Sequence, residues 1–499
     1  MSEVPPGIGD PQLPRERQDE LGQPRIGVDE WVASRGEAAG RRRGFAGIWD
    51  RSIGRVPGWG QLLGVVVLAG LFPVLTSNEY YQLIGFNVLV FSLLALGLNV
   101  VVGWGGLLDL GYVAFFGIGA YTYALLSSDQ FDVHLPTILA ASAAISTATI
   151  LGLLVGLPSR RLVGDYLAIV TLFFLQIFVT LATNATSINF PFKDGPIDVT
   201  GGPNGIANLD PYHVGRFAAE TVRDYYYVAL GFFVVVLAAL HFVNESRTGR
   251  AWRALREDPL AAEAMGIPVN RLKLMAFMFG AGVAGLTGTI FGAQGTGVFP
   301  QDFALSLLIT VYACVILGGA GSIPGVVIGA TIITVSLEVL REANDARIVF
   351  YALVLLAVVA TIRPWSRLAV TLGATVAFGL VVHLLVDRVW ERGTAGSAVT
   401  PGRFRGAIEH WVLLPSDPKT ISNVLFVVLI GLVLLVSALK GWWRIAALVP
   451  TIYLSAIVCE NLLLRDPAAT RFLLLGALLV ALINARPQGL LGTARVEIA

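Results

Sequence analysis

The sequence predicts an all-α protein, built as a polytopic bundle of transmembrane helices. Of its 499 residues, 55% are hydrophobic and only 14% are charged, whereas about a quarter of the residues in a soluble domain are charged. The apolar residues gather in stretches of about twenty residues, which is long enough for a helix to cross the bilayer core. The alternating strands of about ten residues that mark a transmembrane β-barrel are absent. Composition and patterning therefore indicate a multi-pass membrane protein.

About fourteen apolar spans follow one another along the chain. They cover residues 60–76, 80–102, 106–127, 136–157, 166–184, 225–244, 272–293, 304–320, 323–340, 348–362, 367–386, 423–438, 443–460 and 470–485. Short cytoplasmic loops carry an excess of Lys and Arg. On this rule the Arg-rich segment 247–273 is inside, whereas the loops 127–136 and 295–302, which contain no Lys or Arg, are outside. The same orientation places both termini in the cytoplasm.

The stretch 103–126 is dense in glycine, and Asp109 lies near its start. An aspartate near the bilayer centre costs roughly 2.5–3.5 kcal/mol on insertion scales, so it should face a cavity or have a partner. In one interpretation Asp109 lines the translocation path together with Asn99 and Tyr112. In the other interpretation it caps a helix over 110–126 at the inner interface. The predicted topology favours the cap.

The run TGGPNG, from Thr200 to Gly205, has the composition of consecutive tight turns and falls outside in the predicted topology. In one interpretation Thr200, Gly201, Gly202 and Asn204 belong to an ordinary folded loop; that they form an external loop with a binding role is what the resemblance set out below implies. The run is not a nucleotide-binding phosphate loop, because the Lys of a Walker A motif is missing. We therefore expect no ATPase site and no enzymatic activity in this chain.

The remaining polar residues argue against several other classes. The net charge of +1 gives no indication of nucleic-acid binding. Cys314 and Cys459 lie far apart in apolar spans, and the five histidines lack metal-ligand spacing, so we expect no metal site and no bound cofactor. An ion-coupled secondary transporter would need several intramembrane acids, of which Asp109 is the clear candidate. A membrane-embedded enzyme would need clustered catalytic groups.

A charged segment from Arg250 to Ile267 interrupts two apolar stretches. Asp258 is a preferred N-cap residue and Pro259 suits the first helical position, so a short helix should begin at Pro259. Gly266 is well placed to end it. If the helix axis is only kinked at Asp258, Trp252, Leu255, Pro259 and Ala262 share one face, with Arg253, Arg256, Glu257 and Glu263 directed elsewhere. Because so short a helix is marginal alone in water, it is either an interfacial loop helix or docked on a protein, and its acids favour docking.

The segment RTGRAWRALREDPLAAEAMGIPVNRLKLMAF (247–277) resembles the cytoplasmic coupling loop of ABC-importer permeases. Other stretches agree in order with the inner-membrane permeases of the branched-chain amino acid (LivM-type, LivH/LivM) family. They are LGLNVVVGWGGLLDLGYVAFFGIGAYTYALL (96–126), GDYLAIVTL (164–172), TGGPNGI (200–206), VILGGAGSIPGVVIGA (315–330) and ARPQGLLG (485–492). Gln176 departs from the pattern, since the family commonly has Glu there.

The resemblance implies the permease subunit of an importer that moves branched-chain, or related small, amino acids across the bacterial inner membrane. It implies three kinds of partner besides lipid: a second related permease, two ABC ATPases that use ATP and Mg, and a periplasmic or extracellular solute-binding protein. It also implies that ATPase coupling involves Arg250, Arg253, Arg256, Glu257, Asp258, Glu263 and Gly266. The alternatives are the same machinery acting on urea or short amides, and an ion-coupled secondary transporter.

Four regions are expected along the chain. Residues 1–58 form a polar, disordered cytoplasmic tail, and 59–363 form the permease core with its coupling loop at 246–271. Residues 364–469 form an insertion with extra transmembrane helices, and 470–499 supply a closing helix and a cytoplasmic C-terminal tail. A weak repeat between 338–366 and 460–489 favours such an insertion, although any two apolar spans that end in Arg-Pro look alike.

Overall fold

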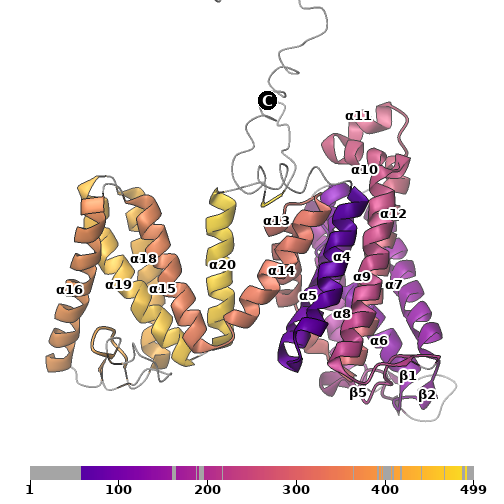
Figure 1. Cartoon of the computed structure of the whole chain (residues 1–499), viewed down its shortest axis with the longest axis horizontal. Helices are drawn as coiled ribbons and strands as arrows, with labels where there is room; N and C mark the ends of the chain where they lie inside the picture. Colours follow the sequence, from indigo (N-terminus) through magenta and orange to yellow (C-terminus); the bar gives the residue numbers. More distant parts are fainter. Residues whose placement is uncertain are drawn as a thin grey trace, which may run out of the picture. The chain divides into compact units, whose positions relative to one another are not determined.

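The computed structural model describes most of the chain after the N-terminal tail (Figure 1). The described residues are 58–159, 165–186, 188–189, 196–215, 217–362, 365–389, 393–394, 396, 406, 409–415, 418–439, 441–465, 467–485 and 489–491. The chain divides into two compact units, residues 1–61 and 62–499. The prediction for the tail at 1–58 lies almost wholly outside the described residues.

The predicted all-α class is confirmed, and each predicted apolar span falls in a helix. The helices of these spans are α4 (Gly58–Leu75), α5 (Glu79–Leu98), α6 (Tyr112–Leu126), α7 (Thr137–Ser159), α8 (Asp165–Asn184), α9 (Val222–Glu245), α12 (Val269–Gln294), α13 (Leu305–Gly318), α14 (Ile323–Val339), α15 (Ala343–Thr361), α16 (Trp365–Val389), α18 (Pro418–Ala438), α19 (Trp442–Arg465) and α20 (Pro467–Ala485). Within the described residues, seven helices are long and apolar enough to cross a membrane. The larger number of crossings stays a prediction.

The core of the second unit is built around α5, α6 and α12. Helix α12 packs against α6 and α7, while α5 packs against α9 and α14. Backbone contact between α6 and α12 depends on glycine, because a Cβ atom on Gly119 would collide with the backbone of Gly285. Small residues that let helices approach this closely are typical of membrane bundles, where burial of apolar surface gives little driving force.

The loops gather at two ends of this bundle (Figure 1). One end carries α10 (Arg247–Glu257) and α11 (Pro259–Ala264). The other carries short strands: β1 (Ser127–Ser128) pairs with β2 (Val133–His134), and β5 (Ile206–Ala207) pairs with β8 (Gly297–Val298). Two further strand pairs, β3 (Ile188–Asn189) with β4 (Pro196–Ile197) and β6 (His213–Val214) with β7 (Phe217–Ala218), lie in the same connection between α8 and α9.

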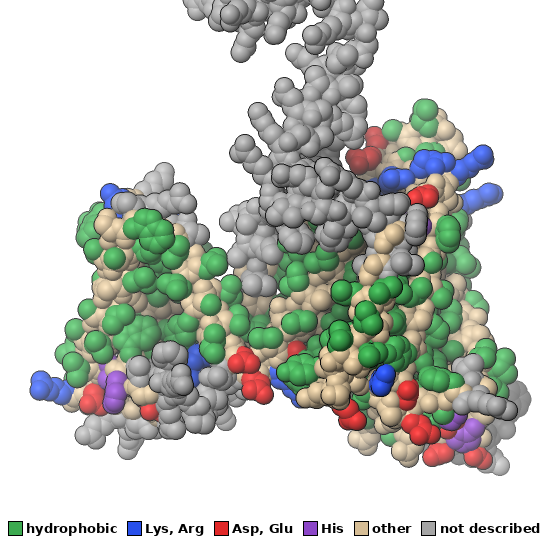
Figure 2. Space-filling view, viewed as in Figure 1, with side chains coloured by type: hydrophobic (Ala, Val, Ile, Leu, Met, Phe, Trp, Pro, Cys, Tyr) green, Lys and Arg blue, Asp and Glu red, His purple; other side chains and the backbone are tan. Residues whose placement is uncertain are grey.

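The side-chain types differ between the two ends. Figure 2 shows Lys and Arg beside Asp and Glu at the end that carries α10 and α11, Asp, Glu and His with a few Lys or Arg toward the opposite end, and mainly hydrophobic side chains between them. The loops that the Lys and Arg distribution assigns to opposite sides of a membrane therefore lie at opposite ends of the bundle.

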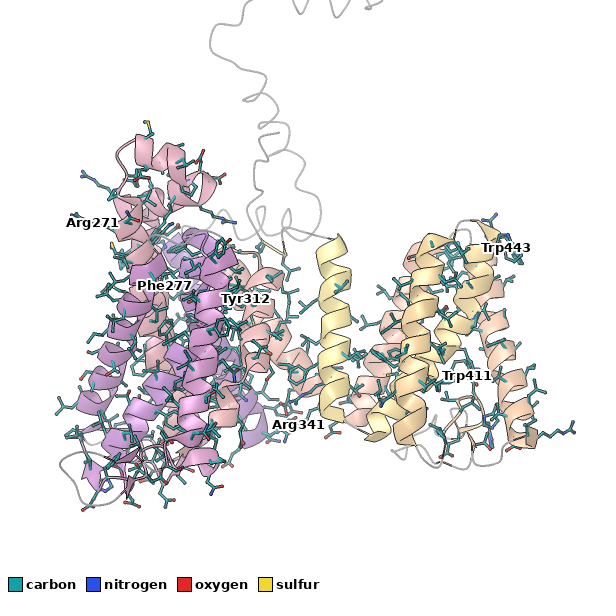
Figure 3. All side chains as sticks on the ribbon, turned by 180° about the vertical axis from the view of Figure 1, so that it is seen from behind. Arg271, Phe277, Tyr312, Arg341, Trp411 and Trp443 are labelled. Carbon is teal, nitrogen blue, oxygen red and sulfur yellow. The ribbon has the colours of Figure 1, made fainter. Side chains whose placement is uncertain are left out.

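The C-terminal helices form a second group around α19. Helix α19 packs against α15, α16, α18 and α20. A buried ion pair joins α15 to α19, with Arg347 Nε 2.9 Å from Glu460 Oε1. Trp411, labelled in Figure 3, packs edge-on against Tyr453 and donates a hydrogen bond from Nε1 to the carbonyl of Val376 at 3.2 Å.

Helix α20 also packs against α13 and α14 of the core. The segment that follows α20 continues this contact, because the backbone N–H groups of Leu490 and Leu491 donate to the carbonyls of Leu317 and Gly318. These hydrogen bonds satisfy the last carbonyls of α13, which have no partner within their own helix.

Candidate functional site

The local structure of the charged segment follows the predicted capping residues. The Asp258 carboxylate accepts hydrogen bonds from the backbone N–H groups of Leu260 at 2.8 Å and Ala261 at 3.1 Å. Helix α11 begins at Pro259, and Gly266 follows it with φ +80°. A positive φ of this size favours glycine, because a Cβ atom strains that backbone conformation. The predicted start and end of this helix are confirmed.

One face of α10 and α11 holds the pair against the core. Trp252, Leu255 and Ala262 are buried. The indole of Trp252 donates from Nε1 to the carbonyl of Leu272 in the first turn of α12 at 2.9 Å. The prediction that Pro259 shares this face is wrong: Pro259 is exposed, because the extended backbone at Asp258, with φ −150° and ψ 107°, breaks the helical register.

Three of the four arginines of α10, namely Arg250, Arg253 and Arg256, bind backbone carbonyls of this chain. Arg250 donates to the carbonyl of Glu245 at 2.9 Å, and Arg253 donates to that of Asn244 at 3.1 Å. Both carbonyls lie at the C-terminal end of α9, which attracts positive charge. Arg256 instead donates from Nη1 to the carbonyl of Ala320, at 3.4 Å, in the turn between α13 and α14. Arg253 is exposed, as expected for a residue directed away from the buried face of Trp252 and Leu255, whereas Arg256 is half-buried.

The opposite face of α11 is exposed and carries both acids and large apolar side chains. Glu257, Asp258, Glu263 and Gly266 are exposed. Leu260 and Met265 are 79% and 83% exposed. The prediction from the sequence did not include Leu260 and Met265. Their signal in the sequence is that both are large apolar residues that do not share the helix face of Ala262.

The core ends beneath α10 in a π-helix, η1 (Asn99–Trp104). Asn99 is 1% exposed, and its Oδ1 accepts a hydrogen bond from the backbone N–H of Gly321 at 2.7 Å. Trp104 donates from Nε1 to the carbonyl of Gly321 at 3.1 Å, and its ring lies 6.0 Å from the ring of Trp252. The structure therefore places Asn99 in a packed junction beneath α10.

Asp109 and Tyr112 are also packed in the interior, at 1% and 0% exposure. Asp109 Oδ1 accepts a hydrogen bond from the N–H of Gly111 at 2.9 Å, and the Tyr312 hydroxyl donates to the Asp109 carbonyl at 2.6 Å. Helix α6 begins at Tyr112 with Gly111 as its N-cap, two residues later than the predicted start at 110. Asp109 thus orders the turn before the helix, since an Asx side chain commonly binds the backbone two residues on.

The candidate outer loop folds tightly at the other end of the bundle. The N–H groups of Gly201 and Gly202 bind Asp198 Oδ1 at 2.8 Å and Thr200 Oγ1 at 3.4 Å. Residues Gly202–Asn204 form the short helix η2, and Asn204 is exposed. Gly205 has φ +65°, and a Cβ atom there would collide with the carbonyl of Val298. The loop therefore presents Asn204 from a rigid base.

His134 joins two outer loops. Its Nδ1 lies 2.7 Å from Asp210 Oδ2, and its Nε2 lies 3.5 Å from Asp129 Oδ1. The hydrogen bond to Asp210 raises the pKa of the exposed His134 imidazole above its ordinary value, because the carboxylate favours the protonated ring. Among the described residues, no group of three or more His, Cys, Asp or Glu side chains could hold a metal ion.

The apolar helices, the two loop-bearing ends and the projecting helix pair define a multi-pass membrane permease. Residues 80–362 match the family described as "Branched-chain amino acid transport system / permease component", and the chain belongs to this family. The matched residues include every candidate site residue from Asn99 to Gly266.

Curated relatives carry the same description. The high-affinity branched-chain amino acid transport system permease protein LivM of Salmonella typhimurium is 36% identical over 307 residues, which cover 57% of this chain and 69% of the relative. LivM of Escherichia coli K12 gives the same identity and coverage. The permease protein LivH of Escherichia coli K12 is 26% identical over 265 residues, or 51% of this chain and 82% of the relative. No solved structure gives a significant match.

Proposed function

We propose that this chain is the permease subunit of an ATP-binding-cassette importer that moves branched-chain, or related small, amino acids across a bacterial inner membrane. The observation that carries the proposal is the family match over 80–362, together with the LivM name of relatives at 36% identity. ATP and Mg are used by partner subunits, and this chain supplies the membrane path and the surface on which the ATPases act.

The partners follow from the same comparison. Relatives named LivM and relatives named LivH both match this chain, which supports a second, related permease beside it. Two ATPases dock on the end that carries α10 and α11, and a solute-binding protein delivers substrate at the opposite end. The residues proposed for the delivery surface are Thr200, Gly201, Gly202 and Asn204.

The shape of α11 fits the coupling role. Its buried face fixes it to α10 and α12, while Leu260 and Met265 project beside exposed acids. Exposed large apolar side chains inside a polar rim are typical of protein interaction sites. Closure of the ATPases then displaces α10 and α11, and the bundle alternates between outward-open and inward-open states.

The domain organisation supports a refined boundary. Helix α20 packs against α13 and α14, which is the position of a closing helix in the core. Helix α15 packs against α19 and α20. We therefore propose that the inserted module comprises α15 to α19, residues 343–466, and that the C-terminal helix completes the permease core. The earlier start, compared with the sequence-based 364–469, follows from the packing of α15.

Purification of the tagged protein from its native membrane tests the function. We expect two Walker-motif ATPases and a second, related permease in the eluate by mass spectrometry. Uptake of labelled leucine should require ATP and be inhibited by valine but not by urea. Competition by urea and short amides would move the substrate to that class. Uptake that survives ATP depletion but collapses with the ion gradient would instead indicate a secondary transporter.

A further inference from the structure

The turn between α13 and α14 is hydrogen-bonded to two segments that lie far from it in the sequence. The turn 319–321 connects α13 to α14, and its two glycines adopt positive φ angles, +102° at Gly319 and +92° at Gly321. Asn99 and Trp104 of η1 bind the backbone of Gly321 through its N–H and its carbonyl. Arg256 of α10 binds the carbonyl of Ala320 from the other side. The turn is therefore shared by η1 and α10.

The contacts in this junction leave little space. A Cβ atom on Gly321 would lie 2.5 Å from Arg256 Nη1, and a Cβ atom on Gly103 would lie 2.6 Å from the Gly321 nitrogen. A Cβ atom on Gly106 would lie 3.5 Å from the Cα atom of Arg256. Close packing of this kind transmits displacement, because packed interiors compress very little.

Arg256 differs from Arg250 and Arg253 of the same helix in what it joins. Arg250 and Arg253 bind carbonyls five and nine residues away, at the end of the preceding helix. Arg256 binds a carbonyl 64 residues away. It is half-buried, whereas Arg250 and Arg253 are exposed. The guanidinium groups of Arg250, Arg253 and Arg256 therefore fix α10 at two places, the end of α9 and the turn between α13 and α14.

The element beneath the turn is suited to respond to motion. A π-helical segment is rare and is found frequently at functional sites. Segment η1 continues α5 and leads through the loop 105–111 to Asp109 and α6. A displacement of the turn 319–321 is thus passed to both helix pairs, α5 with α6 and α13 with α14.

We propose that Arg256 is a positioning residue that locks α10 to the turn 319–321, so that the helix pair α10–α11, the turn and η1 move as one unit during transport. This inference rests on the proposed importer function. Arg256 therefore acts inside the permease, as the link between the ATPase-contacting surface and the path, and does not itself contact the ATPase.

The test uses the whole complex, reconstituted in vesicles, and measures amino acid transported per ATP hydrolysed. Arg256→Gln removes the cation while keeping a polar side chain. Arg271→Gln is the matched control, because Arg271 is exposed at the same end of the bundle (Figure 3). Arg256→Lys keeps a charged donor for the Ala320 carbonyl.

We expect Arg256→Gln to bind the ATPases in normal amount and to hydrolyse ATP, while the transport ratio falls about tenfold, as loss of a charged hydrogen bond implies. Arg256→Lys should restore part of the ratio, and Arg271→Gln should keep the wild-type value. If Arg256→Gln does not accumulate, Arg256→Leu takes its place, because it removes the donor without leaving a polar group in the junction, and a wild-type ratio in it overturns the link.

Two further outcomes would overturn the inference. An unchanged ratio in Arg256→Gln means that α10 transmits motion without this contact. Loss of the ATPases from that variant means that Arg256 contacts the ATPase directly. Absence of ATPases from the wild-type complex is a different failure, because it removes the proposed function together with the link.

Discussion

At the scale of single residues, the segment 247–266 contains two groups of residues: those that hold α11 in place and those whose side chains are exposed to a partner. Asp258 and Gly266 shape the helix through a capping carboxylate and a positive φ. Substituting an N-cap Asp costs about 1 kcal/mol, so a variant at Asp258 mixes folding with docking. Leu260 and Met265 take part in the caps only through their backbone N–H groups, and their side chains are exposed, so changes to these side chains report on docking.

Leu260→Asp should uncouple transport from ATP hydrolysis. We expect the exposed leucine to pack in an apolar site on the ATPase. A carboxylate buried in that site costs enough binding free energy to lower uptake about tenfold or more. Uptake by vesicles containing the complex measures the effect, with Leu260→Met as a control that keeps an apolar side chain. Normal uptake by Leu260→Asp would show that this face of α11 docks on nothing during transport.

At the scale of elements, the outer loops form a fixed surface from segments far apart in the sequence. Strand β5 pairs with β8, and a bridge joins Ser128 to Leu209. His134 adds a hydrogen bond to Asp210 between the same two regions. The connections α6–α7, α8–α9 and α12–α13 are thus joined to one another, and η2 presents Asn204 on the surface that they form.

Asn204→Arg should lower uptake several-fold when the solute-binding protein is limiting, because a charge introduced at the edge of an interface mainly slows association. The exposed side chain is not needed for the turn itself, so the amount of assembled complex should not change. Uptake is measured against the concentration of binding protein, and saturating amounts should restore it. A wild-type dependence would exclude Asn204 from the docking surface.

At the scale of the whole molecule, two helices with similar sequences, α15 and α20, are candidates for the helix that closes the core. The family match ends at Ile362, just after α15, which is the helix that follows α14. Similarity along the sequence therefore assigns α15 to the end of the core. Packing assigns α20 to that place, with the N–H groups of Leu490 and Leu491 on the final carbonyls of α13.

Removal of the module tests which helix closes the core. A chain in which a Gly-Ser linker replaces 343–466 should still assemble with its partners and retain uptake. A chain truncated before Pro467 should lose assembly, because the faces of α13 and α14 that contact α20 are uncovered. Both are compared by yield of the intact complex from membranes. Full assembly of the truncated chain would show that α15 can close the core.

The sequence by itself determined the class and the order of elements. Apolar length identified the helices, because a bilayer requires about twenty apolar residues for a crossing. Local chemistry identified α11, since a capping Asp, a first-turn Pro and a terminal Gly act within a few residues. Family motifs then identified the permease, and the match over 80–362 confirms that membership.

Only the tertiary structure decided where long-range contacts fall. Arg256 reaches Ala320 and Asn99 reaches Gly321 across 64 and 222 residues, and no local pattern encodes such pairs. The same reason applies to α20, whose place depends on which helix fills the surface left by α13 and α14. Capping and hydrophobic span are properties of neighbouring residues, whereas packing is a property of surfaces that the fold brings together.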